Sequence, residues 1–570
     1  MRKVLLWVCS LLLIVFISFK LINFINEGMF YINKKQSAGH LARVAMQAQA
    51  SIPMNACVET SFSKQAPSLE AGTLKYYLYP IKVKDVWQNQ FNQNNKACDT
   101  GYFININKPV TNSFKNPRLS GDLFKSFAFH GLTLVTGVFL FFTLFPQGMA
   151  LLNCWQVLST CFLLGVAIIT MFFLLLTAAG MKLTIITTSG GLLLIVLISY
   201  GWLLMRKGRI VFNQGVRSFS LNEFLLRAIT VFLMIFCLMY TLALPIGIWD
   251  EVIIWLLKAK MFFISQGFIF DYTEFTNNYY PLMWPLNITV QYVLMGGVFE
   301  QAAKWTSAFM FLCLLGQLSI IAKCLGLNAK WQKIAICLFI VLFNHWTFFT
   351  ALPENIYIAF TVMAVAFCLL WMQQDRNAKL GVVLIALWAL SCIKFEGFLT
   401  GIFLFLAYLI SNPNVFRDKK KIMKVSLLLS SVIVYGLWMW WLTHNHIPFK
   451  MFHVQGGFSL NNIEGLGEML FKQMANGGVI YGVVFVAMLI LNRRLSWPRP
   501  QVLVIIFSFI LLLFSLFAGV CWPHQEFLRY YPEVLTRLFS RVSCFLMVIW
   551  LWGIVKLLGN ENNVKNKPSC

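Results

Sequence analysis

Apolar stretches about as long as a bilayer crossing recur along this 570-residue chain. They include 224–247, 305–322, 425–442 and 501–521, and a helical membrane span needs about 20 mostly apolar residues. Hydrophobic residues make up 59% of the chain and charged residues only 12%, and the mean hydropathy is +0.71. A soluble protein of this length would leave much of that surface in water. The pattern therefore predicts an all-α polytopic membrane protein.

The net charge of +25 comes from short basic clusters between the apolar stretches, such as Arg-Lys-Gly-Arg at 206–209. Clusters of this kind mark cytoplasmic loops, whereas a nucleic-acid-binding protein would gather them on one soluble face. We therefore expect no nucleic acid partner. Placing the clusters inside predicts a bundle of about 14 spans with both termini in the cytoplasm. The expected spans are 4–24, 126–146, 154–178, 184–205, 224–247, 303–322, 334–350, 354–373, 378–393, 397–411, 424–443, 477–491, 501–521 and 539–557.

The same pattern divides the chain into four segments. Residues 1–25 predict an uncleaved transmembrane anchor, and 26–124 a small extracytoplasmic domain inserted after the first span, with strands at 74–83 and 101–106. Residues 125–560 predict the multi-span membrane domain, and 561–570 a cytoplasmic tail. The localisation that follows is a bacterial inner membrane, crossed many times.

The stretch 282–298 is apolar but short, and it carries Pro285, Asn287 and Gln291. If it crossed the membrane, the lysines at 323–333 would face outward, against the charge rule. We therefore expect a re-entrant or juxtamembrane helix here.

Acidic residues of the membrane domain gather on the expected outer side, which favours an outer-face site for any chemistry that uses carboxylates. The first candidate is Trp-Asp-Glu at 249–251, just past the end of a span. Two adjacent carboxylates at an interface are costly unless they are solvated or used. The following residues, 252–263, predict an amphipathic helix lying in the interface plane.

These features resemble the polytopic glycosyltransferases of the C-type (GT-C) fold, which include dolichyl-phosphate-mannose protein mannosyltransferases and lipid A aminoarabinose transferases. The resemblance begins at the acidic pair and continues through Asn-Asn-Tyr-Tyr-Pro-Leu-Met-Trp-Pro-Leu at 277–286. It implies that Asp250, with Glu251 beside it, is the catalytic base, and it places Tyr280 in the substrate site. The family often has a His where this chain has Asn277, so we expect no metal or other cofactor.

Three later patches match the family in order, so that the resemblance covers about 225–545. Pro-Glu-Asn-Ile-Tyr at 353–357 resembles Ala-Asp-x-Pro-Leu, with Glu354 in place of the usual Asp. Lys-Phe-Glu-Gly at 394–397 resembles Lys-x-Glu-Gly and contributes Lys394 and Glu396. The region from His524 to Arg541 resembles one that carries an Arg before the last span. The residues that the resemblance assigns to donor or acceptor binding are Tyr280, Glu354, Lys394, Glu396, Arg529 and Arg537.

The implied activity is transfer of a sugar from a polyprenyl-phosphate carrier to a glycan, lipid or protein acceptor on the periplasmic face. A carboxylate can take the proton of an acceptor hydroxyl, and cations can stabilise the departing phosphate. Two other functions stay open. A polysaccharide or lipid-linked-sugar flippase would place charges along a path through the membrane, and a non-catalytic assembly protein would keep the fold without the chemistry.

Overall fold

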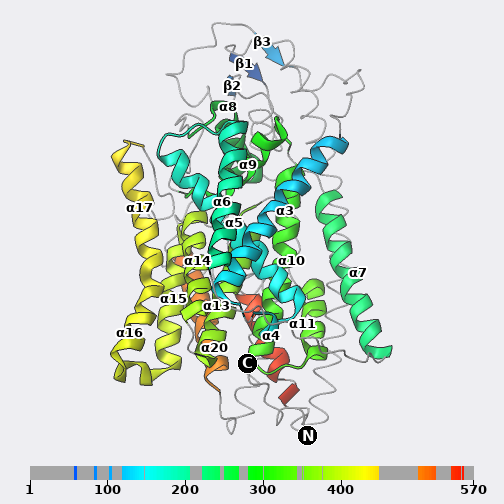
Figure 1. The fold of residues 1–570 in the computed structure, drawn as a ribbon, viewed down its shortest axis with the longest axis vertical. Helices are drawn as coiled ribbons and strands as arrows, with labels where there is room; N and C mark the ends of the chain where they lie inside the picture. Colours follow the sequence, from blue (N-terminus) through cyan, green and yellow to red (C-terminus); the bar gives the residue numbers. More distant parts are fainter. Residues whose placement is uncertain are drawn as a thin grey trace.

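The computed structural model describes most of the membrane domain (Figure 1). The described residues are 57–60, 82–85, 102–104, 119–146, 148–205, 221–243, 250–268, 280–299, 301–342, 350, 352–374, 377–447, 498–520, 541–553 and 555–556. The expected spans at 4–24 and 477–491 and the expected tail at 561–570 lie outside them, as do Arg529 and Arg537.

The described part of the membrane domain is a bundle of helices. Seven of these are long and apolar enough to cross a bilayer, and four shorter apolar helices accompany them. The chain is thus a helical membrane protein, as its hydropathy predicts. The helices that form the bundle are α3 Leu119–Leu144, α5 Cys154–Ala178, α6 Ile185–Met205, α7 Leu221–Ala243, α10 Gln301–Cys324, α11 Ala329–Leu342, α13 Glu354–Gln373, α14 Asn377–Ile393, α15 Glu396–Ser411, α16 Lys419–Ser426, α17 Ser430–His444, α20 Arg499–Val520 and a C-terminal helix Arg541–Gly553.

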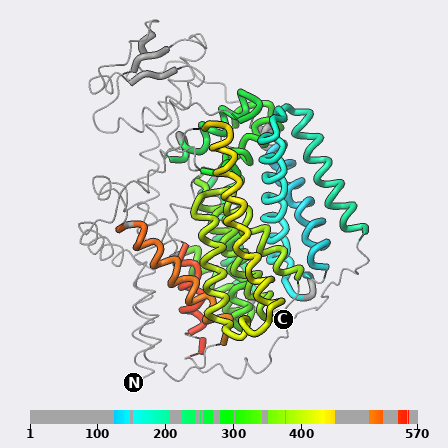
Figure 2. Tube along the Cα trace, turned by 90° about the vertical axis from the view of Figure 1, so that its left-hand side faces the viewer, coloured from blue at the N-terminus to red at the C-terminus, as the bar shows by residue number. Residues whose placement is uncertain are grey.

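Helices α13 and α10 form the centre of the bundle. Other helices bury 94% of the apolar window of α13 and 83% of that of α10, compared with 22% for α6. Helices α7 and α17 lie at opposite edges (Figure 1), and α20 and the C-terminal helix lie together on one side (Figure 2). The outward faces of α6 and α7 are apolar, for example at Leu193 and Phe232, as expected for helices that face lipid.

The two ends of the bundle differ in charge. At one end, Gln373 and Gln501 donate hydrogen bonds to the carbonyls of Cys324 (3.1 Å) and Leu325 (3.2 Å). This end also carries the basic residues of the connections between helices, and we call it the basic end. These residues are Lys323, Lys330, Lys333, Lys379, Arg417, Lys419, Lys420, Lys421 and Lys424.

At the opposite end, Lys394 at the end of α14 meets Glu354 at the start of α13, and the Tyr357 hydroxyl donates to the carbonyl of Glu396, 3.1 Å away, at the start of α15. We call this the ion-pair end. Glu251, Glu354 and Glu396 thus lie at the end opposite the basic connections, each beside a cation.

Two sequence predictions concern shorter elements. The expected re-entrant stretch forms α9, Met283–Met295, whose 13 residues are almost all buried. At 1.5 Å per residue it is only about 20 Å long, too short to span a hydrocarbon layer of about 30 Å.

Three short strands lie in the 26–124 segment, namely β1 Cys57–Thr60, β2 Lys82–Asp85 and β3 Tyr102–Ile104, in a parallel sheet of order β2-β1-β3. The strand expected at 101–106 is present as β3. The one expected at 74–83 is misplaced, because β2 overlaps it only at 82–83, and β1 was not predicted. Tyrosines at 76–79 favoured the earlier position, since aromatic residues are enriched in strands.

Helices α3 and α5 touch through their backbones. A Cβ atom on Gly137 would lie 1.7 Å from the carbonyl oxygen of Cys161, and one on Gly165 would lie 1.9 Å from that of Thr133. Small residues at helix crossings allow this approach in membranes, where association depends on close packing. The two glycines therefore set the distance between α3 and α5.

We expect Gly137→Ala to lower the stability of the bundle by about 1–3 kcal/mol, the usual cost of overpacking, because the new methyl group meets backbone rather than a movable side chain. Gly131→Ala on the same helix is the matched control, since its Cβ would have nothing within 4 Å. Thermal unfolding in detergent compares the two variants. Equal melting temperatures would show that the crossing adapts freely.

Candidate functional site

The turn between α14 and α15 brings two charged side chains to the ion-pair end. Helix α14 ends at Ile393 and α15 begins at Glu396, so Lys394 and Phe395 alone connect them. Gly397 allows this short connection, because a Cβ there would lie 2.0 Å from the carbonyl oxygen of Leu390. The Lys-x-Glu-Gly sequence therefore specifies a tight helical hairpin that presents Lys394 and Glu396 together.

Lys394 forms a buried ion pair with Glu354, the first residue of α13. The side chain of Glu354 is fully buried, and that of Lys394 is 8% exposed. The ammonium group also lies 6.0 Å from the ring centroid of Trp255 and 5.9 Å from that of Tyr280, within the range of a cation–π interaction. Two predicted residues thus meet directly, and a third, Tyr280, forms part of their aromatic wall.

Trp255 belongs to η2, the π-helix Asp250–Leu256, which starts at the predicted catalytic residue. The ring centroids of Trp255 and Tyr280 are 5.3 Å apart. The π-helical form is rare and is often found at functional sites. Through Trp255, the segment that carries the acidic pair contacts the Lys394–Glu354 pair.

The two neighbouring carboxylates of η2 have different environments. Asp250 is partly exposed, whereas Glu251 is fully buried and lies 3.0 Å from the Nζ atom of Lys304, which is also fully buried. Lys304 is in the first turn of α10. Glu251 therefore anchors η2 to a central helix, and Asp250 is the more exposed member of the pair.

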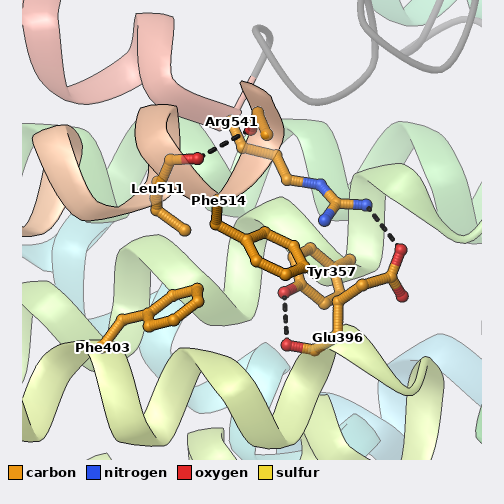
Figure 3. A pocket seen from close by; sticks show the side chains of 7 residues that line it. Tyr357, Glu396, Phe403, Leu511, Phe514 and Arg541 are labelled. Atoms are coloured by element: carbon orange, nitrogen blue, oxygen red, sulfur yellow. Dashed lines mark hydrogen bonds and ion pairs between the residues drawn. The ribbon is translucent and has the colours of Figure 1, made fainter. Parts of the chain in front are cut away.

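Glu396 pairs with a different cation from its neighbour Lys394. Its Oε1 atom lies 3.9 Å from Nη2 of Arg541, whose guanidinium carbon is 4.1 Å from the ring centroid of Tyr357 (Figure 3). The Tyr357 hydroxyl also hydrogen-bonds to Thr400 at 2.7 Å. These groups line a cavity of about 10 Å³, which holds at most one water molecule. This second cluster positions α15 against the C-terminal helix and leaves no room for a sugar.

One sequence prediction about this region is wrong. The stretch 252–263 does not lie on the membrane surface but forms η2 and α8, Leu257–Ser265, and residues 257–262 are all buried. Even Lys258 and Lys260 are only 2% and 8% exposed. The alternation of lysines with apolar residues resembles an interface helix, but α8 packs against α9, where Thr289 donates a hydrogen bond to the carbonyl of Ala259 at 3.1 Å. Its Phe262 also packs with Tyr435 and Trp438 of α17.

The predicted residues are thus divided among three groups. Glu354, Lys394 and Tyr280 meet, Asp250 and Glu251 lie on the adjoining π-helix, and Glu396 faces Arg541, which the sequence comparison had placed before the last span. Arg529 and Arg537 lie outside the described residues. The sequence analysis did not single out Lys304. A lone lysine in the first turn of an expected span, at the same end as an expected acidic pair, could have indicated an ion-pair partner.

Among the described residues, no group of three or more His, Cys, Asp or Glu side chains is placed to hold a metal ion. Comparison with known proteins gives no relative, because no protein family, curated protein or solved structure matches the chain.

Lys304→Met should destabilise the protein by about 3–5 kcal/mol, because it leaves the Glu251 carboxylate buried without its cation. The double variant Glu251→Leu/Lys304→Met removes both charges and should recover most of the loss. Chemical or thermal unfolding in detergent micelles measures the difference. A single variant as stable as the unmodified protein would mean that Glu251 is neutralised in another way.

Burial lowers the pKa of Lys258, in the short helix α8, from 10.5 to about 7. Between about pH 7 and pH 10.5 the unfolded chain therefore binds a proton that the folded chain does not, and stability should rise with pH across this window. Below pH 7 the amine is protonated in both the folded and the unfolded chain, so the full cost of burying its charge lowers the stability of the fold. Lys258→Met should reduce the rise, as measured by melting temperature from pH 7 to pH 10. Identical slopes in both proteins would contradict the assignment.

Proposed function

We propose that the protein is a membrane glycosyltransferase that moves a sugar from a polyprenyl-phosphate carrier to an acceptor hydroxyl. The observation that carries the proposal is the meeting of η2 with the Lys394–Glu354 pair and the aromatic wall of Trp255 and Tyr280. A cation beside aromatic rings suits a phosphosugar head group, because it combines charge with stacking surfaces.

In this proposal Asp250 is the general base. It takes the proton of the acceptor hydroxyl while that oxygen attacks the anomeric carbon and the bond to the carrier phosphate breaks. A single displacement of this kind inverts the configuration of the sugar. Partial exposure suits Asp250 for the role, whereas Glu251 is committed to Lys304 in the interior.

Lys394 is the proposed cation for the carrier phosphate, and Glu354 holds its ammonium group in place until the donor enters. Arg529 and Arg537, which lie outside the described residues, are the other two cations of the proposed set. Glu396 supports the site indirectly, because its pairing with Arg541 fixes the start of α15 beside Lys394.

The proposed location is a bacterial inner membrane, with the ion-pair end in the periplasm. Support comes from the positive-inside rule, since the basic connections gather at the opposite end. A periplasmic enzyme has no nucleotide sugars available, so a lipid-phosphate donor follows from this orientation. The acceptor can be a glycan, a lipid or a protein.

The placement of charge also favours an enzyme over a flippase. In the described helices of the bundle, ionisable Asp, Glu, Lys and Arg side chains lie within the first or last two turns. A path for a charged head group would place charged side chains near the middle of the membrane. The described ion pairs gather instead at one end, where a site for interfacial chemistry belongs.

Asp250→Asn should lower the rate of sugar transfer by about 10²–10⁴, because the amide keeps the shape of the side chain but cannot accept the proton. The assay is single-turnover transfer by the purified protein with a panel of polyprenyl-phosphate sugars. Melting temperature should stay close to that of the unmodified protein, which separates a chemical defect from a folding defect.

Glu251→Gln is the matched control, one residue away on η2. Its main effect should be on stability, since it breaks the pair with Lys304. Normal transfer by Asp250→Asn would remove Asp250 as the base. Turnover of a nucleotide sugar without any lipid carrier would overturn the proposed function as a whole.

A further inference from the structure

A large cavity opens at the other end of the bundle, far from the site described above. It has a volume of about 620 Å³ and lies between α5, α7, α10 and α11. Small-molecule sites typically enclose about 300–1,000 Å³. Helix α7, at the edge of the bundle, forms its outer wall (Figure 1).

The lining changes from polar to apolar along the helices. On α7 the cavity is lined first by Arg227 and Thr230 and then by Met234 and Leu238. From Arg227 to Leu238 the helix rises about 16 Å, so the charged part lies near the basic end and the apolar part lies deeper in the membrane.

The other helices repeat this gradient. Helix α11 begins at the basic end and contributes Lys333 before Ile336, whereas α10 runs the opposite way and contributes Leu312 before Ser319. Three helices therefore share the gradient and give one cavity with a cationic mouth and an apolar interior. A neutral lipid would match the apolar interior alone, whereas an anionic lipid matches both the interior and the positive charge at the mouth.

The mouth of the cavity is held in shape by hydrogen bonds. Ser319 receives one from Gln156 of α5 at 3.0 Å and donates one to Gln332 of α11 at 3.2 Å. Ser319 and Gln332 both line the cavity. These bonds fix the spacing of α5, α10 and α11 at the polar end of the cavity, as a preformed site requires.

We propose that this cavity binds an anionic membrane phospholipid, with one acyl chain between α7 and α10 and the phosphate against Arg227 and Lys333. Basic pockets between transmembrane helices on the cytoplasmic side are a known way to recognise anionic head groups. The gradient of the lining matches a phospholipid in its normal orientation, with the head group at the interface and the chain directed to the midplane. The inference does not depend on the proposed transferase activity.

The test is native mass spectrometry of the full-length protein in detergent, with phosphatidylglycerol or phosphatidylcholine of the same acyl chains. We expect the unmodified protein to retain phosphatidylglycerol preferentially. Arg227→Gln/Lys333→Gln should weaken that retention by about thirtyfold, the factor for losing two basic side chains near a membrane surface. Lys420→Gln/Lys421→Gln removes the same charge from exposed positions at the basic end and should retain the lipid normally.

Two further variants keep the test decisive if the charge-free variant misfolds. Arg227→Lys/Lys333→Arg preserves both charges and should retain the lipid, whereas Met234→Trp/Ile336→Trp fills the apolar interior and should lose it. Equal retention of the two phospholipids, or normal retention by the filled variant, would overturn the proposal. Displacement of the lipid by soluble glycerol phosphate would also overturn it, because the site would then recognise a free phosphate.

Discussion

Charge that is buried at one end of the bundle constrains the arrangement of its helices. An ionised side chain removed from water costs several kcal/mol even after relaxation, and only a well-placed partner offsets this cost. Among the described residues, three pairs meet the constraint, in which Glu251 meets Lys304, Glu354 meets Lys394, and Glu396 meets Arg541. Each pair joins a different set of segments, so together they connect η2, α10, α13, α15 and the C-terminal helix.

A contribution to stability does not by itself explain why the protein has such ion pairs. Apolar residues of similar volume usually do as well or better in a protein interior, and the same helices contain many Leu, Ile and Phe residues that pack in this way. The pairs instead fix the relative positions of the helices. Any shift of one helix against another would leave a buried charge without its partner, which is strongly disfavoured. The fixed positions of η2 and the Lys394 turn are what a site at this end needs.

The sequence predicts the helices of the bundle well where a long apolar run ends in polar residues. The expected spans 154–178 and 354–373 coincide with α5 and α13, because hydropathy changes sharply at their ends. The 252–263 stretch was misjudged because burial of Lys258 and Lys260 depends on contacts with α9, more than twenty residues later in the chain. The pairing of Glu251 with Lys304 escaped the sequence for the same reason, since no local pattern joins residues that far apart. Lys394 and Glu354 were singled out by their resemblance to motifs of the GT-C family, and in the structure they meet at adjoining helix ends.

The two ends of the bundle can influence each other only through its helices. Helix α10 has 24 residues and is therefore about 36 Å long, and each ion pair carries no net charge as a whole. Direct electrostatic coupling between the cationic cavity and the ion pairs is thus weak. Helix α10 nevertheless belongs to both regions, with Lys304 in one pair and Leu312 and Ser319 in the cavity wall. A lipid that changed the spacing of α7 and α10 would act on η2 through the Glu251–Lys304 pair. If α10 moves, Lys304 moves with it, and Glu251 must follow because breaking a buried ion pair is costly.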